Sequence, residues 1–115
     1  MQSLAPMPRG ILATVTARLG EAVTTESLRE ALLTAYAGEP FVHLLPEGAW
    51  PTTAATAGSN SAQLQVAADT HAGRAVVVVA IDNLVKGAAG QAIQNANLVL
   101  GLDETAGLDP NGVAP

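Results

Sequence analysis

The residue types best suited to chemistry follow Asp82, where an apolar stretch gives way to a glycine-rich one. The side chain of Asn83 offers both a hydrogen-bond donor and an acceptor, and the ammonium of Lys86 favours an anion. Gly87 and Gly90 have no side chain, so a flat ligand or an opposing backbone can approach closely. A helix that begins here would also direct N–H groups at a ligand, which predicts a ligand site at a helix N-terminus.

Two other groups have the chemistry to hold an anion. Ser59 and Asn60 follow a glycine, and their hydroxyl and N–H groups suit a carboxylate or a phosphate. The guanidinium of Arg9 suits a carboxylate because it offers paired donors. Simpler interpretations are more common for all of these patterns: an ordinary turn, a solvated arginine, and glycines that only let a helix pack closely on a sheet.

The composition argues against several kinds of site and partner. The chain has 115 residues, no cysteine, a formal net charge of −5, and only five Lys and Arg residues, which are scattered. It therefore has no thiol nucleophile, and nucleic acid is disfavoured because its binding needs clustered basic residues. His43 and His71 have no further ligand at metal spacing, which argues against a metal site.

Membrane and secretory signals are also missing from the sequence. No apolar run approaches the roughly 18 residues of a membrane span. The segment before Arg9 has neither a basic region nor a long apolar core. The lack of cysteine gives no indication of an oxidising compartment. The sequence therefore predicts a cytoplasmic protein that binds no nucleic acid, membrane or metal.

Hydrophobic periodicity predicts the strands that must position the candidate residues. Four strands are expected, at residues 10–18, 41–45, 59–68 and 74–81. The first strand has one drier side, and the last is the most apolar because it is rich in valine. A short turn at residues 69–73 joins the last two strands, so we expect them to be antiparallel neighbours.

Helices are expected before and after this set of strands. Residues 24–37 show the period of an amphipathic helix, and Thr24 or Thr25 can cap its first turn. Residues 50–58 are interpreted as an irregular connection with a short strand at its end, and a second helix follows Asn83. The order β-α-β-β-β-α predicts an α+β fold, with a mostly antiparallel sheet and helices on one face.

The second helix carries an apolar stripe that needs a partner. Its members are Ala89, Ile93, Ala96 and Leu100, widened by Ala92 and Val99. An uncovered stripe of this kind is expected to make the chain self-associate or to lower its solubility. The tail after Gly101 is polar and is expected to form a loop.

Several segments resemble a known enzyme family over nearly the whole chain. They are Pro6–Ile11, Tyr36–Pro46, Ala57–Asn60, Ile81–Ala92, Asn95–Leu102 and Gly112–Pro115. The most specific of them, Asp82-Asn-Leu-Val-Lys-Gly-Ala-Ala-Gly-Gln-Ala92, is similar to a motif in the C-terminal part of N-acetyl-γ-glutamyl-phosphate reductases. This family reduces an acyl phosphate to N-acetylglutamate semialdehyde with NADPH, in arginine biosynthesis.

The resemblance implies a fold and a division of the chain. Residues 1–82 would form part of a substrate and dimerisation domain of the kind found in semialdehyde dehydrogenases and glyceraldehyde-3-phosphate dehydrogenase. Residues 83–115 would form a helix and tail that pack on an NADP-binding domain absent from this chain. By resemblance, Asn83, Gly87 and Gly90 lie near the nicotinamide of NADP, and Arg9, Ser59 and Asn60 lie toward the substrate.

The catalytic groups of that family are missing from this chain. The family's cysteine thiolate attacks the acyl phosphate, and its Rossmann domain carries a Gly-x-Gly-x-x-Gly fingerprint. Both would lie, with a catalytic histidine, in an N-terminal part that precedes the Pro6 segment. The resemblance therefore implies the C-terminal portion of a reductase, inactive alone. The alternatives are a non-enzymatic dimerisation or interaction domain and one half of a split enzyme. The expected partner is a second copy of the chain or a separate Rossmann-domain chain.

Overall fold

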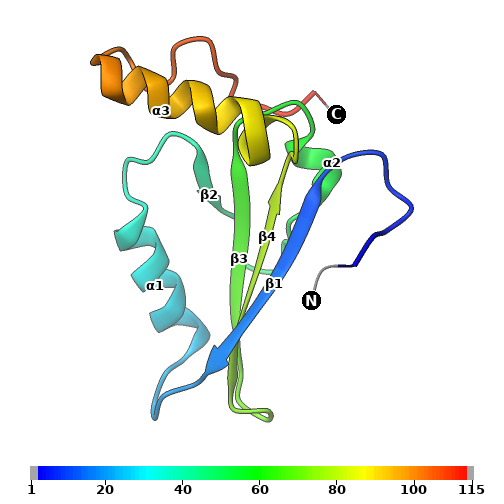
Figure 1. Ribbon diagram of the computed structural model, residues 1–115. Helices are drawn as coiled ribbons and strands as arrows, with labels where there is room; N and C mark the ends of the chain where they lie inside the picture. Colours follow the sequence, from blue (N-terminus) through cyan, green and yellow to red (C-terminus); the bar gives the residue numbers. More distant parts are fainter. Residues whose placement is uncertain (1–2, 114–115) are drawn as a thin grey trace.

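A four-stranded sheet forms the centre of the computed structural model, which describes residues 3–113 (Figure 1). The strands are β1 (Ile11–Arg18), β2 (Val42–Leu44), β3 (Ala62–Asp69) and β4 (Arg74–Ile81). Their order is β1-β4-β3-β2; β1–β4 and β3–β4 are antiparallel, and β2–β3 is parallel. The predicted α+β class and mostly antiparallel sheet are therefore confirmed.

The hairpin of β3 and β4 is the centre of this sheet. The two strands pair along their whole length, from Ala62 opposite Ile81 to Asp69 opposite Arg74. The turn between them closes as the sequence predicts: Asp69 Oδ1 accepts a hydrogen bond from the Ala72 N–H at 2.9 Å, and Gly73 takes a φ of 63°. Glycine adopts that left-handed conformation without the penalty that a side chain brings.

Helix α1 (Thr25–Ala35) covers the β2 and β3 side of one sheet face. The Thr24 hydroxyl accepts the Ser27 N–H at 3.2 Å, and the Ser27 hydroxyl accepts the Thr24 N–H at 3.0 Å. This reciprocal pair satisfies two donors at the helix start, so Thr24 is the cap, one of the two residues predicted for that role. The apolar stripe of this helix consists of Leu28, Ala31, Leu32, Ala35 and Tyr36. Of these, Leu28 and Leu32 are half-buried and the others are exposed.

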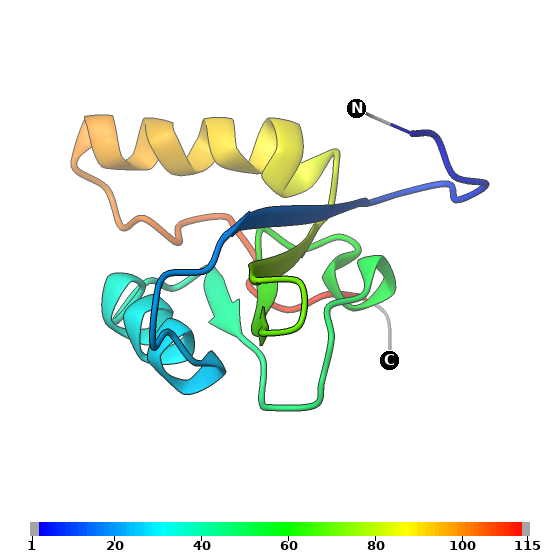
Figure 2. The ribbon, with the colours of Figure 1, turned by 90° about the horizontal axis from the view of Figure 1, so that it is seen from below.

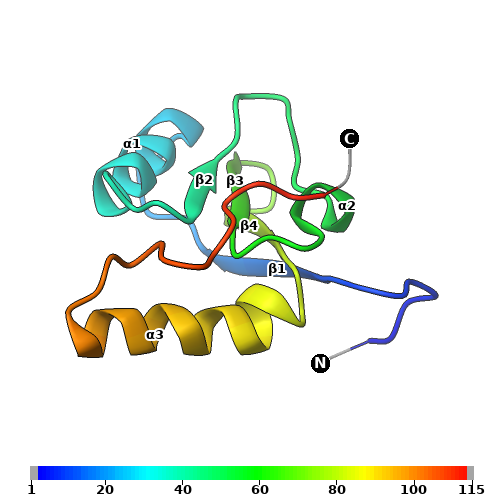
Figure 3. The ribbon, with the colours of Figure 1, turned by 90° about the horizontal axis from the view of Figure 1, so that it is seen from above.

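The segment expected to be an irregular connection contains a short helix, α2 (Thr53–Thr56), and no strand. The interpretation of residues 50–58 was therefore wrong. The Thr52 hydroxyl accepts the Ala55 N–H at 3.3 Å and so caps a single helical turn. Seen along the strands, α1 and α2 lie on opposite sides of the sheet (Figures 2 and 3).

The second predicted helix begins with a wide turn, η1 (Val85–Ala89), in which N–H groups bond five residues back, and continues as α3 (Gly90–Leu100). It runs across the end of the sheet at which β4 finishes (Figure 1). The helices thus differ from the expected arrangement on one face. After β4 the chain turns out of the sheet, and α3 crosses the ends of the strands (Figure 1).

Burial in this chain is concentrated in polar groups. The buried apolar residues are Phe41, Leu64, Val66, Ala75 and Ala80. The buried polar residues are Thr56, Ser59, Asn60, Ser61, Gln65, Asp82 and Asn97. Buried polar groups must be hydrogen-bonded to each other or to the backbone. The interior is therefore held together more by specific hydrogen bonds than by the packing of apolar side chains.

The most apolar strand is not the most buried one. The central valines of β4 are only half-buried, and seven of the eight residues of β1 are exposed, so the predicted drier side of β1 was wrong for this chain. Residues opposite one another in the register share a face, so one face of β1 and β4 carries only apolar residues such as Val15 and Val77. The contacts of helix α1 with the sheet are mainly to β2 and β3.

Two findings concern membrane spans and metal ions. Within residues 3–113, no helix combines the length and apolar character needed to cross a membrane. The same residues contain no group of three or more His, Cys, Asp or Glu that could hold a metal ion.

Candidate ligand site at the end of the sheet

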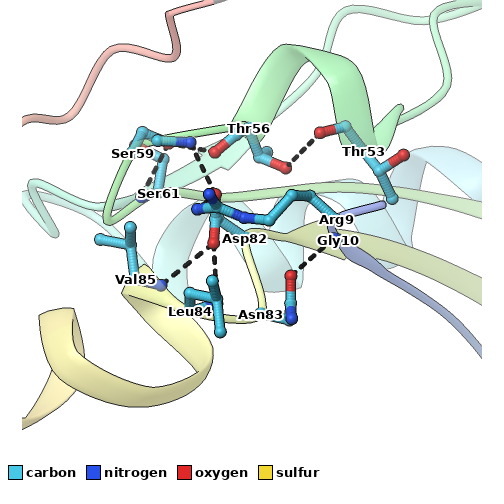
Figure 4. A network of polar contacts seen from close by, with 11 residues as sticks. Arg9, Gly10, Thr53, Thr56, Ser59, Ser61, Asp82, Asn83, Leu84 and Val85 are labelled. Atoms are coloured by element: carbon cyan, nitrogen blue, oxygen red, sulfur yellow. Dashed lines mark hydrogen bonds and ion pairs between the residues drawn. The ribbon is translucent and has the colours of Figure 1, made fainter. Parts of the chain in front are cut away.

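One end of the sheet brings together every residue predicted for the site. Ile11, at the start of β1, lies opposite Ile81 at the end of β4, which in turn lies opposite Ala62 at the start of β3. The segments just outside these three positions are residues 9–10, 58–61 and 82–83. The topology therefore places Arg9, Ser59 and Asn83 side by side, although they are far apart in the sequence (Figure 4), and Asn60 directly follows Ser59.

The centre of the site is Asp82, whose side chain is fully buried. Its Oδ2 accepts from Arg9 Nη2 at 2.5 Å and from the Gly58 N–H at 2.6 Å. Its Oδ1 accepts from the Leu84 N–H at 2.8 Å and the Val85 N–H at 3.0 Å. One carboxylate thus joins the segment before β1, the loop before β3 and the first turn after β4 (Figure 4).

These four donors keep the Asp82 carboxylate charged. Burial by itself raises the pKa of this group, but the Arg9 guanidinium and the N–H groups of Gly58, Leu84 and Val85 outweigh burial and hold the pKa well below its usual range. A buried carboxylate is tolerated only with such a set of partners.

Asn83 is half-buried and fixed on one side. Its Oδ1 accepts the Gly10 N–H at 2.7 Å, which ties the turn after β4 to the start of β1. The carbonyl oxygen of the amide is thereby used inside the protein. The Nδ2 group remains as the donor that Asn83 can offer to an acceptor on a ligand.

The two candidate glycines lie in different environments. Gly87 is exposed, and a Cβ built on it would meet nothing nearer than the Asp82 carbonyl oxygen at 3.4 Å. Gly90 is buried, and a Cβ there would lie 2.3 Å from Asn60 Oδ1 and 2.6 Å from Val85 Cγ1. Gly90 is therefore required by packing, while Gly87 leaves an open surface.

Ser59 and Asn60 are buried, and most of their polar atoms bond within the chain. The Ser59 hydroxyl donates to the Thr56 carbonyl at 2.9 Å and accepts the Ser61 N–H at 3.3 Å. Asn60 Nδ2 donates to Gln94 Oε1 at 2.9 Å. Asn60 Oδ1 has no hydrogen-bond partner within the described residues and lies against Gly90. These two side chains shape the site from beneath its surface.

The N–H groups at the helix start are largely occupied as well. Those of Leu84 and Val85 bond to Asp82 Oδ1, and that of Gly87 bonds to the Asp82 carbonyl at 2.9 Å. The chain's own aspartate thus takes the place that the sequence pattern suggests for a ligand anion. Ligand contacts at this point would come from side chains, with Asn83 foremost.

A second polar cluster involves Gln94, which the sequence patterns did not single out. Its Oε1 accepts from Lys86 Nζ at 2.7 Å as well as from Asn60, and its Nε2 donates to Glu104 Oε1 at 2.7 Å. Lys86 Nζ also lies 5.5 Å from the centroid of the Phe41 ring. Burial lowers the pKa of Lys86, partly opposed by the carboxylates of Glu104 and Glu39. Lys86 is thus engaged inside the protein.

The C-terminal segment (residues 103–113) is a loop, as predicted, but it is bound to the site. The Asn60 N–H donates to the Asp109 carbonyl at 2.8 Å, and Ser61 Oγ donates to the Pro110 carbonyl at 2.5 Å. The Val113 N–H donates to the Ala57 carbonyl at 2.8 Å. This segment covers the loop before β3 from outside.

The arrangement favours binding over covalent chemistry. His43 Nε2 lies 3.1 Å from Ser61 Oγ, the spacing of a base and a nucleophile. The Ser61 proton, however, is given to the Pro110 carbonyl, so His43 donates to Ser61 and does not activate it. Arg9, Asn83 and Gly87 are the predicted residues that a ligand can reach, with an anion-binding group and an amide donor among them.

Comparisons with known proteins agree with the resemblance seen in the sequence. Residues 1–83 match the family described as semialdehyde dehydrogenase, dimerisation domain. N-acetyl-γ-glutamyl-phosphate reductases are similar along nearly the whole chain. That of Streptomyces coelicolor is 63% identical over 113 residues, which are 98% of this chain and 33% of that protein. That of Acidothermus cellulolyticus is 64% identical over 112 residues, which are 97% of this chain and 33% of that protein. The chain therefore spans about a third of the length of these curated relatives.

Proposed function

Because the chain belongs to the semialdehyde dehydrogenase dimerisation-domain family, we propose that it is the C-terminal portion of an N-acetyl-γ-glutamyl-phosphate reductase. The observation that carries this proposal is the identity of 63% over 98% of the chain to a protein of that name. The complete protein would reduce N-acetyl-γ-glutamyl phosphate to N-acetylglutamate semialdehyde, releasing phosphate, with NADPH as reductant. The cytoplasm is its proposed location.

The residues of the site fit an NADP cofactor and an anionic substrate. When bound, NADPH supplies the hydride. Asn83 Nδ2 has the right polarity to donate to a carboxamide oxygen, since Asn83 Oδ1 already accepts from Gly10. Gly87 leaves a bare surface beside it on which a flat ring can lie. Arg9, whose side chain is 41% exposed, has the charge to hold the substrate. Ser59, Asn60 and Gly90 support these groups from within.

The nucleophile must come from outside these 115 residues, because they contain no cysteine. We therefore expect this chain alone to show no reductase activity. The longer protein that contains it should consume NADPH in the presence of the acyl phosphate. The measurement is the decrease in NADPH absorbance for both proteins. Turnover by the isolated chain, or none by the longer protein, would contradict the proposal.

The apolar stripe of α3 is the proposed contact with the NADP-binding domain. All six predicted members are exposed, and Val99 is 85% exposed. The chain alone is therefore expected to self-associate and to bind hydrophobic dyes. Val99→Lys should reduce both effects, while Asn95→Lys, an exposed polar position on the same helix, should not. Light scattering and dye fluorescence make the comparison. A monodisperse monomer that binds little dye would contradict this expectation.

A non-enzymatic dimerisation domain is the second candidate. The family description itself and the exposed apolar residues of β1, such as Ile11 and Val15, favour association with a further copy of the chain. We propose a homo-oligomer in either case. Because both candidates predict self-association, the intact mass in the source cells separates them: a species of 11.6 kDa with no longer protein would favour this second candidate. Co-purification with a separate Rossmann-domain chain would favour a split enzyme.

A further inference from the structure

Asp82 lies between the two groups that the proposed function assigns to different ligands. Arg9 is assigned to the substrate anion and Asn83 to the cofactor. The Asp82 carboxylate bonds to the Arg9 side chain on one oxygen and, on the other, to the two N–H groups that follow Asn83. It is fully buried, so it touches no ligand itself.

The Arg9 guanidinium needs such an anchor to act at a fixed point. An arginine side chain has many rotamers, and its planar head recognises an anion only when it is held in one orientation. Asp82 binds one of the two terminal nitrogens, Nη2, while the side chain remains 41% exposed. The anchor is itself rigid, because three backbone N–H groups hold the carboxylate in place.

We propose that Asp82 is a positioning residue that fixes Arg9 relative to Asn83, so that a bound substrate anion and the cofactor are held in a fixed position relative to each other. This inference rests on the proposed function of the site. It assigns Asp82 no contact with either ligand and no share in proton transfer. Its effect on the substrate passes through Arg9, and its effect on the cofactor side passes through the turn that contains Asn83.

Asp82→Asn separates these two effects. The amide oxygen can still accept from Leu84 and Val85, so the turn that contains Asn83 stays in place. The amide NH2 would instead face Arg9 and the Gly58 N–H, where donor meets donor. In the complete protein, we expect the KM for the acyl phosphate to rise about 10- to 100-fold. The dissociation constant of NADPH, measured by fluorescence, should change by less than about threefold. Asp69→Asn, an exposed carboxylate at the opposite end of the sheet, is the matched control and should change neither.

A double-mutant cycle with Arg9→Met tests whether Asp82 acts through Arg9. Once Arg9 is replaced, Asp82→Asn should add little to the rise in KM. The proposal would be overturned if the two substitutions raised KM additively, or if Asp82→Asn weakened the binding of substrate and of NADPH equally. Arg9→Lys provides a second test if Asp82→Asn does not fold. Lysine keeps the positive charge beside Asp82 but lacks the paired donors of the guanidinium. This variant should also raise the KM for the substrate and leave the dissociation constant of NADPH unchanged.

Failure of the proposed function has a separate signature. A wild-type protein that binds NADPH but does not turn over would remove the reductase assignment. The dissociation constant of N-acetylglutamate, which carries a carboxylate in place of the acyl phosphate, then replaces KM in the same four proteins. Weaker binding in Asp82→Asn that disappears in the Arg9→Met background supports the positioning role. No binding in any of the four, or uncoupled effects, refutes it.

Discussion

Asp82→Ala is expected to lower the free energy of unfolding by about 3 to 5 kcal/mol, the usual cost of removing one partner of a buried ion pair. The substitution leaves the N–H groups of Gly58, Leu84 and Val85 without their acceptor, and each unsatisfied buried donor is costly. Urea unfolding followed by circular dichroism measures the loss. Asp69→Ala removes an exposed carboxylate that accepts from one N–H, so its cost should stay within about 1 kcal/mol.

The pH dependence of the difference in unfolding free energy between wild type and Asp82→Ala gives an independent check. The folded-state pKa of Asp82 lies below its unfolded value, because Arg9 and the three N–H groups outweigh the effect of burial. The stability from its charge is therefore complete above the unfolded pKa of about 3.9 and is lost as the pH falls through the lower folded value. The gap between wild type and Asp82→Ala should stay constant from about pH 5 to 8 and shrink only in stronger acid. A gap that closes near neutral pH would mean that Asp82 is not held as a charged acceptor.

Gly90→Ala is expected to destabilise the protein by about 3 kcal/mol, at the upper end of ordinary overpacking. The added Cβ would lie 2.3 Å from Asn60 Oδ1, 2.6 Å from Val85 Cγ1 and 2.8 Å from the Val85 carbonyl carbon. Asn60 cannot move aside easily, because it is fully buried and bonded to Gln94 and Asp109. Thermal unfolding measures the effect.

Gly87→Ala is the matched control for this substitution. It lies three positions earlier in the same helical stretch, and its nearest neighbour would be 3.4 Å away. Alanine favours a helix over glycine by about 1 kcal/mol, so this variant should be neutral or slightly more stable. Equal losses in the two variants would show that Gly90 is not distinguished by its packing.

Local patterns predicted all the helices and strands except α2, and they singled out segments that the fold brings together at one end of the sheet. The capped helix α1 and the β3–β4 hairpin follow from side-chain period, from Thr24 and from the turn at residues 69–73. The short helix α2 was missed because one turn has no period; Thr52 ahead of two alanines was the available signal. The parallel pairing of β2 with β3 depends on where α1 returns the chain, which no local pattern records.

The roles within the site required the three-dimensional structure. Asp82 was visible as a polar residue directly after an apolar strand, but two of its four donors, Arg9 and Gly58, come from distant parts of the sequence. Asp82 lies two residues before Leu84 and three before Val85, as a capping aspartate does at the start of a helix. This spacing was the sequence signal for its role. Gly87 and Gly90 look alike in sequence, and the positions of Asn60 and Val85 in the fold distinguish them.

The bonds from the C-terminal segment to the loop before β3 have a consequence for biosynthesis. A chain emerging from the ribosome makes β3 and β4 early, but Asn60 and Ser61 must wait for Asp109 and Pro110 before their last hydrogen bonds can form. Contacts of such sequence separation slow folding, because the loop must close before they contribute. This corner of the molecule is thus expected to mature last, and a nascent chain halted before residue 109 would be an easy substrate for proteases and chaperones.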